Sequence, residues 1–197
     1  FEELFQGVSK INWEDWIGID DAFPVKGHCI NSQLASVPDC QKIIKKAVVS
    51  RLSEKYMLPW LEETDAVHQI QFLIMNDKVS IMLDTSGAGL HKRGYRAESN
   101  DAPIKETLAA AMVELSRVRS NHFVVDPMCG SGTILIEAAM KELNFAPGIN
   151  RYFACEKWSC VPKSAFEEER ELAKSKISTD RRFKEARNEN IKCNFNT

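Results

Sequence analysis

Residues 126–133 carry the clearest chemical signal in the sequence, because two glycines there join an apolar segment to a helix. The run reads Asp-Pro-Met-Cys-Gly-Ser-Gly-Thr, and the apolar residues 121–125 and 134–140 flank it. A strand, a glycine turn and a helix in immediate succession are typical of the first βα unit of a doubly wound sheet. Gly130 and Gly132 allow a tight turn and let a ligand approach the backbone. The N–H groups that open the helix favour an anionic group of that ligand.

Two common ligands of such a turn do not fit this spacing. A phosphate-binding P-loop needs Lys and then Ser or Thr after its last glycine, and here Thr133 and Ile134 follow. A dinucleotide fingerprint needs a third Gly or Ala three residues after the second glycine, where the sequence has Leu135. The remaining option is a ligand with one carboxylate and one amine, such as the methionine end of S-adenosylmethionine. We expect Asp126 to accept hydrogen bonds from the amine and the helix amides to hold the carboxylate.

The elements around this segment predict an α/β domain. Apolar residues at helical spacing predict a helix over 104–117, and a charged helix is expected over 163–177. Residues 121–125 are expected to form a short buried strand. Trp158 and Phe153 are interpreted as core residues, not as a platform for a substrate.

The first part of the chain has a different pattern. Residues 1–17 predict a short helix and an entry loop, and residues 39–56 predict a long helix. Residues 23–30 look like a short strand pair that Gly27 interrupts. The change to a period of two over 67–83 predicts a β-hairpin. We place the main domain boundary near position 90.

Composition and charge set the class of protein. The formal net charge is −2, which argues mildly against nucleic-acid binding by bulk electrostatics, so a local basic face would be needed. Lys92, Arg93 and Arg96 form a candidate for this face, and the basic side of the helix 39–56 is either a second candidate or simply solvated.

The six cysteines form no C-x-x-C pair, so we expect reduced thiols in the cytoplasm and no metal site. No apolar run is long enough to span a membrane.

In combination, several segments of the sequence resemble the THUMP-domain RNA methyltransferases, and more narrowly the branch that methylates guanine N2 in large-subunit ribosomal RNA. The glycine run followed by Ile-Glu-Ala-Ala resembles the cofactor motif of this family. Four further segments also resemble parts of the family: the latter THUMP region (1–84), the connector between its domains (90–96), the helix beside the cofactor (104–111) and the insertion after its first helix (146–158).

The resemblance implies a Rossmann-like class I methyltransferase domain over 91–197, incomplete, after a THUMP-like α+β RNA-binding region and connector over 1–90. The implied cofactor is S-adenosylmethionine, and the implied partner is RNA, with ribosomal RNA as the expected substrate. No membrane and no metal is expected as a partner. The residues that would border the cofactor are Asp126, Cys129 (as a small wall residue), Gly130, Ser131, Gly132, Thr133 and, from the preceding helix, Thr107.

The sequence departs from the family pattern in two places. A second strand ending in an acidic residue should lie between Lys184 and Glu185, so we expect a segment to be missing there. The Asn-Pro-Pro-Tyr or Asp-Pro-Pro-Tyr loop that would accept hydrogen bonds from the target amine is not in the sequence, so no catalytic residue is assigned. Phe1 in place of Met indicates that the chain starts inside a longer protein.

Three other functions remain open at this point. A non-catalytic RNA-binding module could keep a relic of the cofactor fold. Adenine-N6 methyltransferases of DNA share the same type of catalytic loop, so that loop alone would not decide the substrate. Related THUMP enzymes act on transfer RNA.

Overall fold

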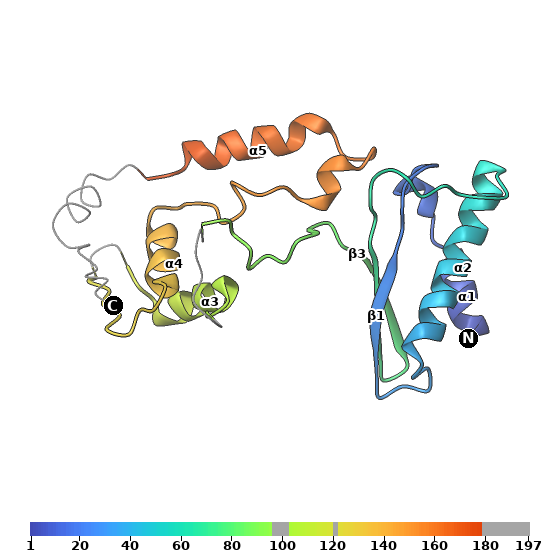
Figure 1. Ribbon diagram of the computed structural model, residues 1–197, viewed down its shortest axis with the longest axis horizontal. Helices are drawn as coiled ribbons and strands as arrows, with labels where there is room; N and C mark the ends of the chain where they lie inside the picture. Colours follow the sequence, from blue (N-terminus) through green and yellow to red (C-terminus); the bar gives the residue numbers. More distant parts are fainter. Residues whose placement is uncertain (96–102, 120–121, 179–197) are drawn as a thin grey trace. The chain divides into compact units, whose positions relative to one another are not determined.

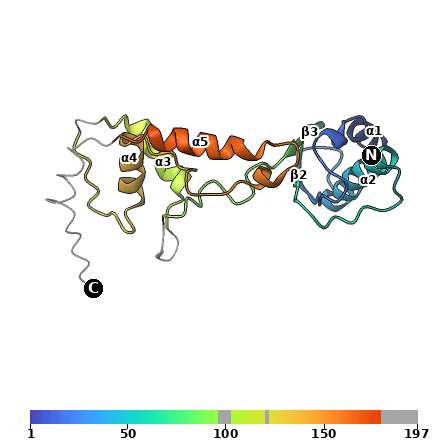
Figure 2. The same cartoon turned by 90° about the horizontal axis from the view of Figure 1, so that it is seen from above.

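The computed structural model describes residues 1–95, 103–119 and 122–178, and the chain divides into two compact units. Unit 1 contains Phe1–Gly89 and Tyr152–Ala165, and unit 2 contains Leu90–Arg151 and the residues from Phe166 onward. Figures 1 and 2 show the elements of each unit in two views.

Unit 1 is built on a three-stranded sheet in the order β1-β2-β3. Strand β1 (Val25–Ile30) is parallel to β2 (Ile70–Met75), and β2 is antiparallel to β3 (Lys78–Leu83). The helix α2 (Val37–Tyr56) connects β1 to β2, and α1 (Glu2–Ser9) lies beside α2 on the same face of the sheet (Figure 1). A 3₁₀ turn, η1 (Trp13–Asp15), follows α1.

Local sequence explains the hairpin and the long helix, and both predictions are confirmed. Asn76 and Asp77 have φ values of 50° and 59°, as the two central residues of a type I′ turn require. In α2, Pro38 stands in the first turn, where its missing N–H costs nothing. The helix ends at Met57, which adopts a left-handed conformation with φ of 54°.

The prediction that Gly27 interrupts a strand pair is wrong, because β1 runs through this residue without a break. A different physical reason explains why this position has a glycine. A Cβ atom at position 27 would lie 2.2 Å from the carbonyl oxygen of Phe72 and 2.4 Å from its ring. Gly27 therefore allows β1 and β2 to approach each other closely.

The core of unit 1 lies between the sheet and α2. Alternate residues of β2 (Ile70, Phe72 and Ile74) are buried, as expected for a strand that covers a core with one face. Ile44, Val48 and Leu52 of α2 are fully buried at helical spacing and belong to the same cluster.

A segment from the second half of the sequence completes this unit. Residues 152–165 contain the 3₁₀ turn η2 (Ala154–Lys157) and Trp158, which is buried as predicted. The Trp158 ring stacks on His68 with 4.3 Å between ring centroids, and its Nε1 donates a hydrogen bond to the carbonyl oxygen of Val67 at 3.1 Å. The sequence alone did not indicate that this segment packs on the first half of the chain.

Unit 2 contains α3 (Glu106–Ser116), α4 (Thr133–Glu142) and most of α5 (Lys163–Ser175), which agree with the three predicted helices. Helices α3 and α4 pack against each other, and Ala109, Val113 and Ala138 are buried there. None of the helices in the described ranges is long and apolar enough to cross a membrane.

The predicted strand over 121–125 is not formed in the part of it that the structure describes. Phe123 and Val125 are 97% and 80% exposed, and residues 122–126 pair with no other described strand. A strand is stable only with a hydrogen-bonded neighbour, and residues 1–95, 103–119 and 122–178 provide none here. The segment expected to be missing between Lys184 and Glu185 falls outside the described residues.

Candidate functional site

The glycine loop 126–133 folds into two tight turns that lead into α4. Gly130 and Gly132 have φ values of 52° and 72°, in the left-handed region. The Gly132 amide donates to the carbonyl oxygen of Cys129 at 2.8 Å. The Gly132 carbonyl then accepts the first helical hydrogen bond, from the Ile136 amide at 2.9 Å.

Backbone conformation, and not crowding, is the reason for glycine at both positions. A Cβ atom built at Gly130 or Gly132 would meet no atom of the structure within 4 Å. The space beside the loop is therefore open, and a ligand can reach the backbone directly. The amides of the first turn of α4 have no acceptor inside the helix, so they can donate to an anionic group. These features fit the carboxylate of an amino-acid ligand.

The polar side chains of the loop supply complementary groups. Asp126 is half-buried, and its Oδ1 accepts a hydrogen bond from the Met128 amide at 3.1 Å. Its Oδ2 has no partner among the described residues, so it remains an acceptor for an amine. Ser131 Oγ and Thr133 Oγ1 lie 3.1 Å apart, and Thr133 is 2% exposed. The Cys129 thiol is half-buried, with Sγ 3.8 Å from the carbonyl oxygen of Gly130.

The other residues singled out in the sequence lie in different surroundings. Thr107 is exposed in the first turn of α3, and no hydrogen bond between described residues joins it to the loop. Lys92 is exposed. Arg96 lies outside the described residues.

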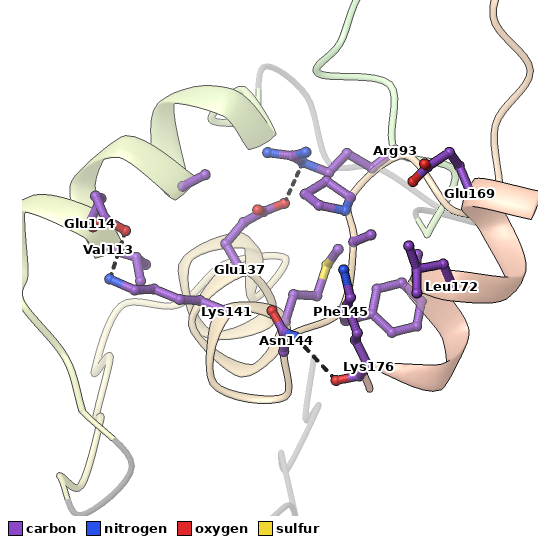
Figure 3. Close-up of a pocket in the computed structure, with 15 residues that line it drawn as sticks. Arg93, Val113, Glu114, Glu137, Lys141, Asn144, Phe145, Glu169, Leu172 and Lys176 are labelled. Carbon is purple, nitrogen blue, oxygen red and sulfur yellow. Dashed lines mark hydrogen bonds and ion pairs between the residues drawn. The ribbon is translucent and has the colours of Figure 1, made fainter. Parts of the chain in front are cut away.

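Arg93 is held inside unit 2. Its Nε lies 2.8 Å from Glu137 Oε1, and the two side chains are 10% and 3% exposed. The Tyr95 hydroxyl donates to the same oxygen at 2.9 Å. Figure 3 shows Glu137 pointing from α4 toward Arg93. We call Arg93, Tyr95 and Glu137 the connector clamp.

Sequence reasoning did not identify Glu137 or Tyr95 as part of any site. One signal was available for Glu137, which is the only carboxylate within the otherwise apolar run 134–140. A carboxylate in such a run is either exposed or paired, because an isolated buried charge is strongly unfavourable.

A pocket of about 450 Å³ lies among α3, α4 and α5 and does not include the glycine loop (Figure 3). Its wall contains the ion pair between Lys141 and Glu114, with 2.7 Å between Nζ and Oε2. Asn144 Nδ2 also donates to the carbonyl oxygen of Lys176 at 3.1 Å. The pocket is therefore distinct from the candidate cofactor loop, and its lining includes Arg93 and Glu137.

Two protein-family models match the chain. Residues 1–84 match the THUMP domain, and residues 93–194 match the family described as "RMKL-like, methyltransferase domain". The second match includes the glycine loop, α3, α4 and α5.

Two curated relatives and one solved structure extend this result. The chain is 46% identical over 182 residues to "Putative RNA methyltransferase YpsC" of Bacillus subtilis (strain 168), covering 91% of this chain and 47% of that protein. It is 38% identical over 158 residues to "Ribosomal RNA large subunit methyltransferase K/L" of Psychromonas ingrahamii, covering 79% of this chain and 21% of that protein.

The solved structure is "SMU.472, a putative methyltransferase complexed with SAH". It is 42% identical with a TM-score of 0.85, covering 91% of this chain and 48% of that one. The chain thus spans less than half the length of the relatives that it matches.

Proposed function

Because this chain belongs to the RMKL-like methyltransferase family and contains a THUMP domain, we propose that the protein methylates RNA with S-adenosylmethionine as the methyl donor. The observation that carries this proposal is the loop 126–133, where two left-handed glycines lead into α4 beside open space. The relative that is described as complexed with SAH, the demethylated form of this donor, supports the choice of cofactor.

The loop residues bind and orient the donor. Asp126 Oδ2 accepts a hydrogen bond from the amine, and the amides of the first turn of α4 hold the carboxylate at the positive end of the helix dipole. Gly130 and Gly132 keep the approach open, and Cys129, Ser131 and Thr133 border the ligand. When bound, S-adenosylmethionine supplies a methyl group on a positively charged sulfur, which a base amine can attack in line. Thr107 is a weaker candidate for a contact.

RNA is the proposed substrate, and the THUMP region over 1–90 is proposed to bind it before the methyltransferase domain over 91–197 acts. Lys42 and Lys46 are exposed one turn apart on α2 and form the proposed basic face of unit 1 despite the net negative charge, with Lys42 also 3.8 Å from Asp39. Lys92 and Arg96 are proposed to extend this contact in the connector. Arg93 is engaged by Glu137, so its proposed contribution is to hold the connector rather than to bind a phosphate.

The proposed target is the exocyclic N2 of a guanine in large-subunit ribosomal RNA. The resemblance of the connector and the cofactor motif to this branch supports it, as does the name of the ribosomal RNA relative. The proposed location is the cytoplasm, where the thiols of the described cysteines, none of which forms a disulfide, would stay reduced.

The proposal is tested by binding and by transfer. Calorimetry with S-adenosylhomocysteine should show binding to the chain at a 1:1 ratio. Transfer of a labelled methyl group should then be measured with the full-length protein, because no catalytic residue is assigned within residues 1–197, on ribosomal RNA, transfer RNA and duplex DNA, with ribosomal RNA as the expected acceptor. Binding of RNA without binding of the cofactor would identify a non-catalytic module and contradict the proposal. Transfer only to DNA would contradict the choice of substrate.

A further inference from the structure

Arg93 and Tyr95 of the connector meet Glu137, more than 40 residues later in the sequence, at a single carboxylate oxygen. Glu137 Oε1 lies 2.8 Å from Arg93 Nε and accepts a hydrogen bond from the Tyr95 hydroxyl at 2.9 Å. Both segments were recognised in the sequence for other reasons, and neither the proposed binding of the cofactor nor that of RNA uses this contact.

The connector clamp is buried, so its members depend on one another. With side chains 3% and 10% exposed, Glu137 and Arg93 have lost most of their hydration. Removal of one partner from a buried ion pair leaves an uncompensated charge, which is far more destabilising than the loss of an exposed pair. The Glu137 carboxylate is therefore tolerated in α4 only while the connector lies against it.

Helix α4 needs such a contact to hold its position. It has only 10 residues, and isolated helices shorter than about 12–15 residues are marginally stable in water. Its other described contacts include the packing of Ala138 near α3, the contact of Thr133 Oγ1 with Ser131 Oγ at 3.1 Å, and the ion pair between Lys141 and Glu114, whose carboxylate side chain is 75% exposed. Exposed ion pairs contribute little. Among the described residues, the connector clamp supplies the buried ion pair of α4, and Glu137 lies one turn after Thr133, where the glycine loop ends.

From this geometry we propose that Arg93 and Tyr95 are positioning residues for the cofactor, which act through Glu137 to fix the N-terminal turn of α4. The identity of the ligand in this proposal rests on the proposed function. The effect of the connector clamp on the stability of α4 can be measured without any ligand. The binding of the methionine end depends on the direction of the first-turn amides, so a helix that loses the clamp presents them poorly.

The first test compares Arg93→Met with Lys92→Met, its exposed neighbour. Hydrogen exchange followed by mass spectrometry should show the amides of 133–140 exchanging at least about tenfold faster in Arg93→Met. A tenfold faster exchange corresponds to a loss of about 1.4 kcal/mol in the free energy of local opening of α4. Strand β2 of unit 1 should keep its rate in both variants, and Lys92→Met should match the wild type. Unchanged exchange over 133–140 in Arg93→Met would overturn the proposal.

The second test measures the dissociation constant of S-adenosylhomocysteine by calorimetry. Arg93→Met should weaken binding by about tenfold or more, and the double variant Arg93→Met/Glu137→Met should recover most of it, because an apolar pair can replace a buried ion pair. Leu52→Ala is the control for stability, since Leu52 is fully buried in the core of unit 1 and the connector clamp belongs to unit 2. It should lower the melting temperature and leave the dissociation constant unchanged.

The outcomes separate the two proposals. If the wild-type chain binds no S-adenosylhomocysteine, the proposed function fails, while the exchange rates still decide whether the clamp holds α4. If the wild type binds and Arg93→Met binds equally well, the positioning role is wrong although the function stands. Should Arg93→Met not fold, Tyr95→Phe removes only the hydroxyl and should give the same pattern with smaller changes.

Discussion

Gly132 is the residue on which the geometry of the candidate cofactor loop depends most directly. Its φ of 72° is disfavoured for any residue with a Cβ atom, although the space around it is open. Gly132→Ala should therefore destabilise unit 2 by about 1–2 kcal/mol and weaken binding of S-adenosylhomocysteine. Urea denaturation and calorimetry measure these effects.

Gly7 provides the matched control. It also has open space, but it lies inside α1 without a positive φ. Gly7→Ala should be neutral or stabilising, because alanine is the better helix former. Equal losses in both variants would contradict a special role for the left-handed turn.

His68 makes the stability of unit 1 depend on pH. The side chain is fully buried, with Nε2 2.9 Å from Asp21 Oδ2 and its ring against Trp158. Burial lowers the pKa of His68 below its ordinary value of about 6.5, and the nearby Asp21 carboxylate offsets part of this. A depressed pKa of a histidine favours the neutral form in the folded state, so its contribution to stability is present above pH 6.5 and is lost as the pH falls below that.

Unfolding by urea at pH 7.5 and pH 5.5 tests this. The free energy of unfolding should fall with pH in the wild type, and His68→Gln should flatten the decrease. His28→Gln is the control, since His28 is exposed on β1. A wild-type protein whose stability does not change over this range would contradict the prediction.

At the scale of elements, β1 and β2 approach each other at Gly27 too closely to admit a Cβ atom. A Cβ atom there would clash with both the backbone and the ring of Phe72, so the strands would have to separate. Gly27→Ala should destabilise unit 1 by at least about 2 kcal/mol, in the range of overpacked cores. Thermal unfolding followed by circular dichroism measures the loss, and a melting temperature equal to that of the wild type would show that the strands can move apart.

The same residue shows what the sequence could and could not predict about the elements. Periodicity identified α2 and the hairpin of β2 and β3, because each buries one face at a regular spacing. It misplaced a break at Gly27, since a sequence does not tell whether glycine allows a turn or a close approach. The strand expected over 121–125 was inferred from its apolar residues alone. A strand also requires a hydrogen-bonded neighbouring strand, and the sequence of the segment itself does not show whether one is present.

The candidate site shows the same division. The turn at Gly130 and Gly132 could be predicted because its signal is local, a spacing of glycines before a helix. The connector clamp could not, because Arg93 and Glu137 are joined only by tertiary packing. A basic run such as 91–96 looks the same in sequence whether its cations bind RNA or a buried carboxylate.

At the scale of the whole molecule, unit 1 depends on a tryptophan from the second half of the chain. Trp158 is 3% exposed, stacks on His68 and donates to the Val67 carbonyl. Trp158→Ala should destabilise unit 1 by about 3–5 kcal/mol, because it removes a large buried side chain. Trp60→Ala is the matched control, as Trp60 is 73% exposed, and it should leave stability nearly unchanged. Urea unfolding measures both, and equal effects would contradict the dependence.

This dependence has a consequence for how the protein is made. The ribosome adds Trp158 to the growing chain 91 residues after it adds Val67. At about 5–20 residues per second, the wait is roughly 5–18 s. During this interval the ring of His68 lacks Trp158 against it, although α2 already exists and the sheet is fully synthesised once Leu83 has been added. Final closure of unit 1 must therefore await translation of much of the second half, and a nascent chain stalled before residue 158 carries an unfinished first unit.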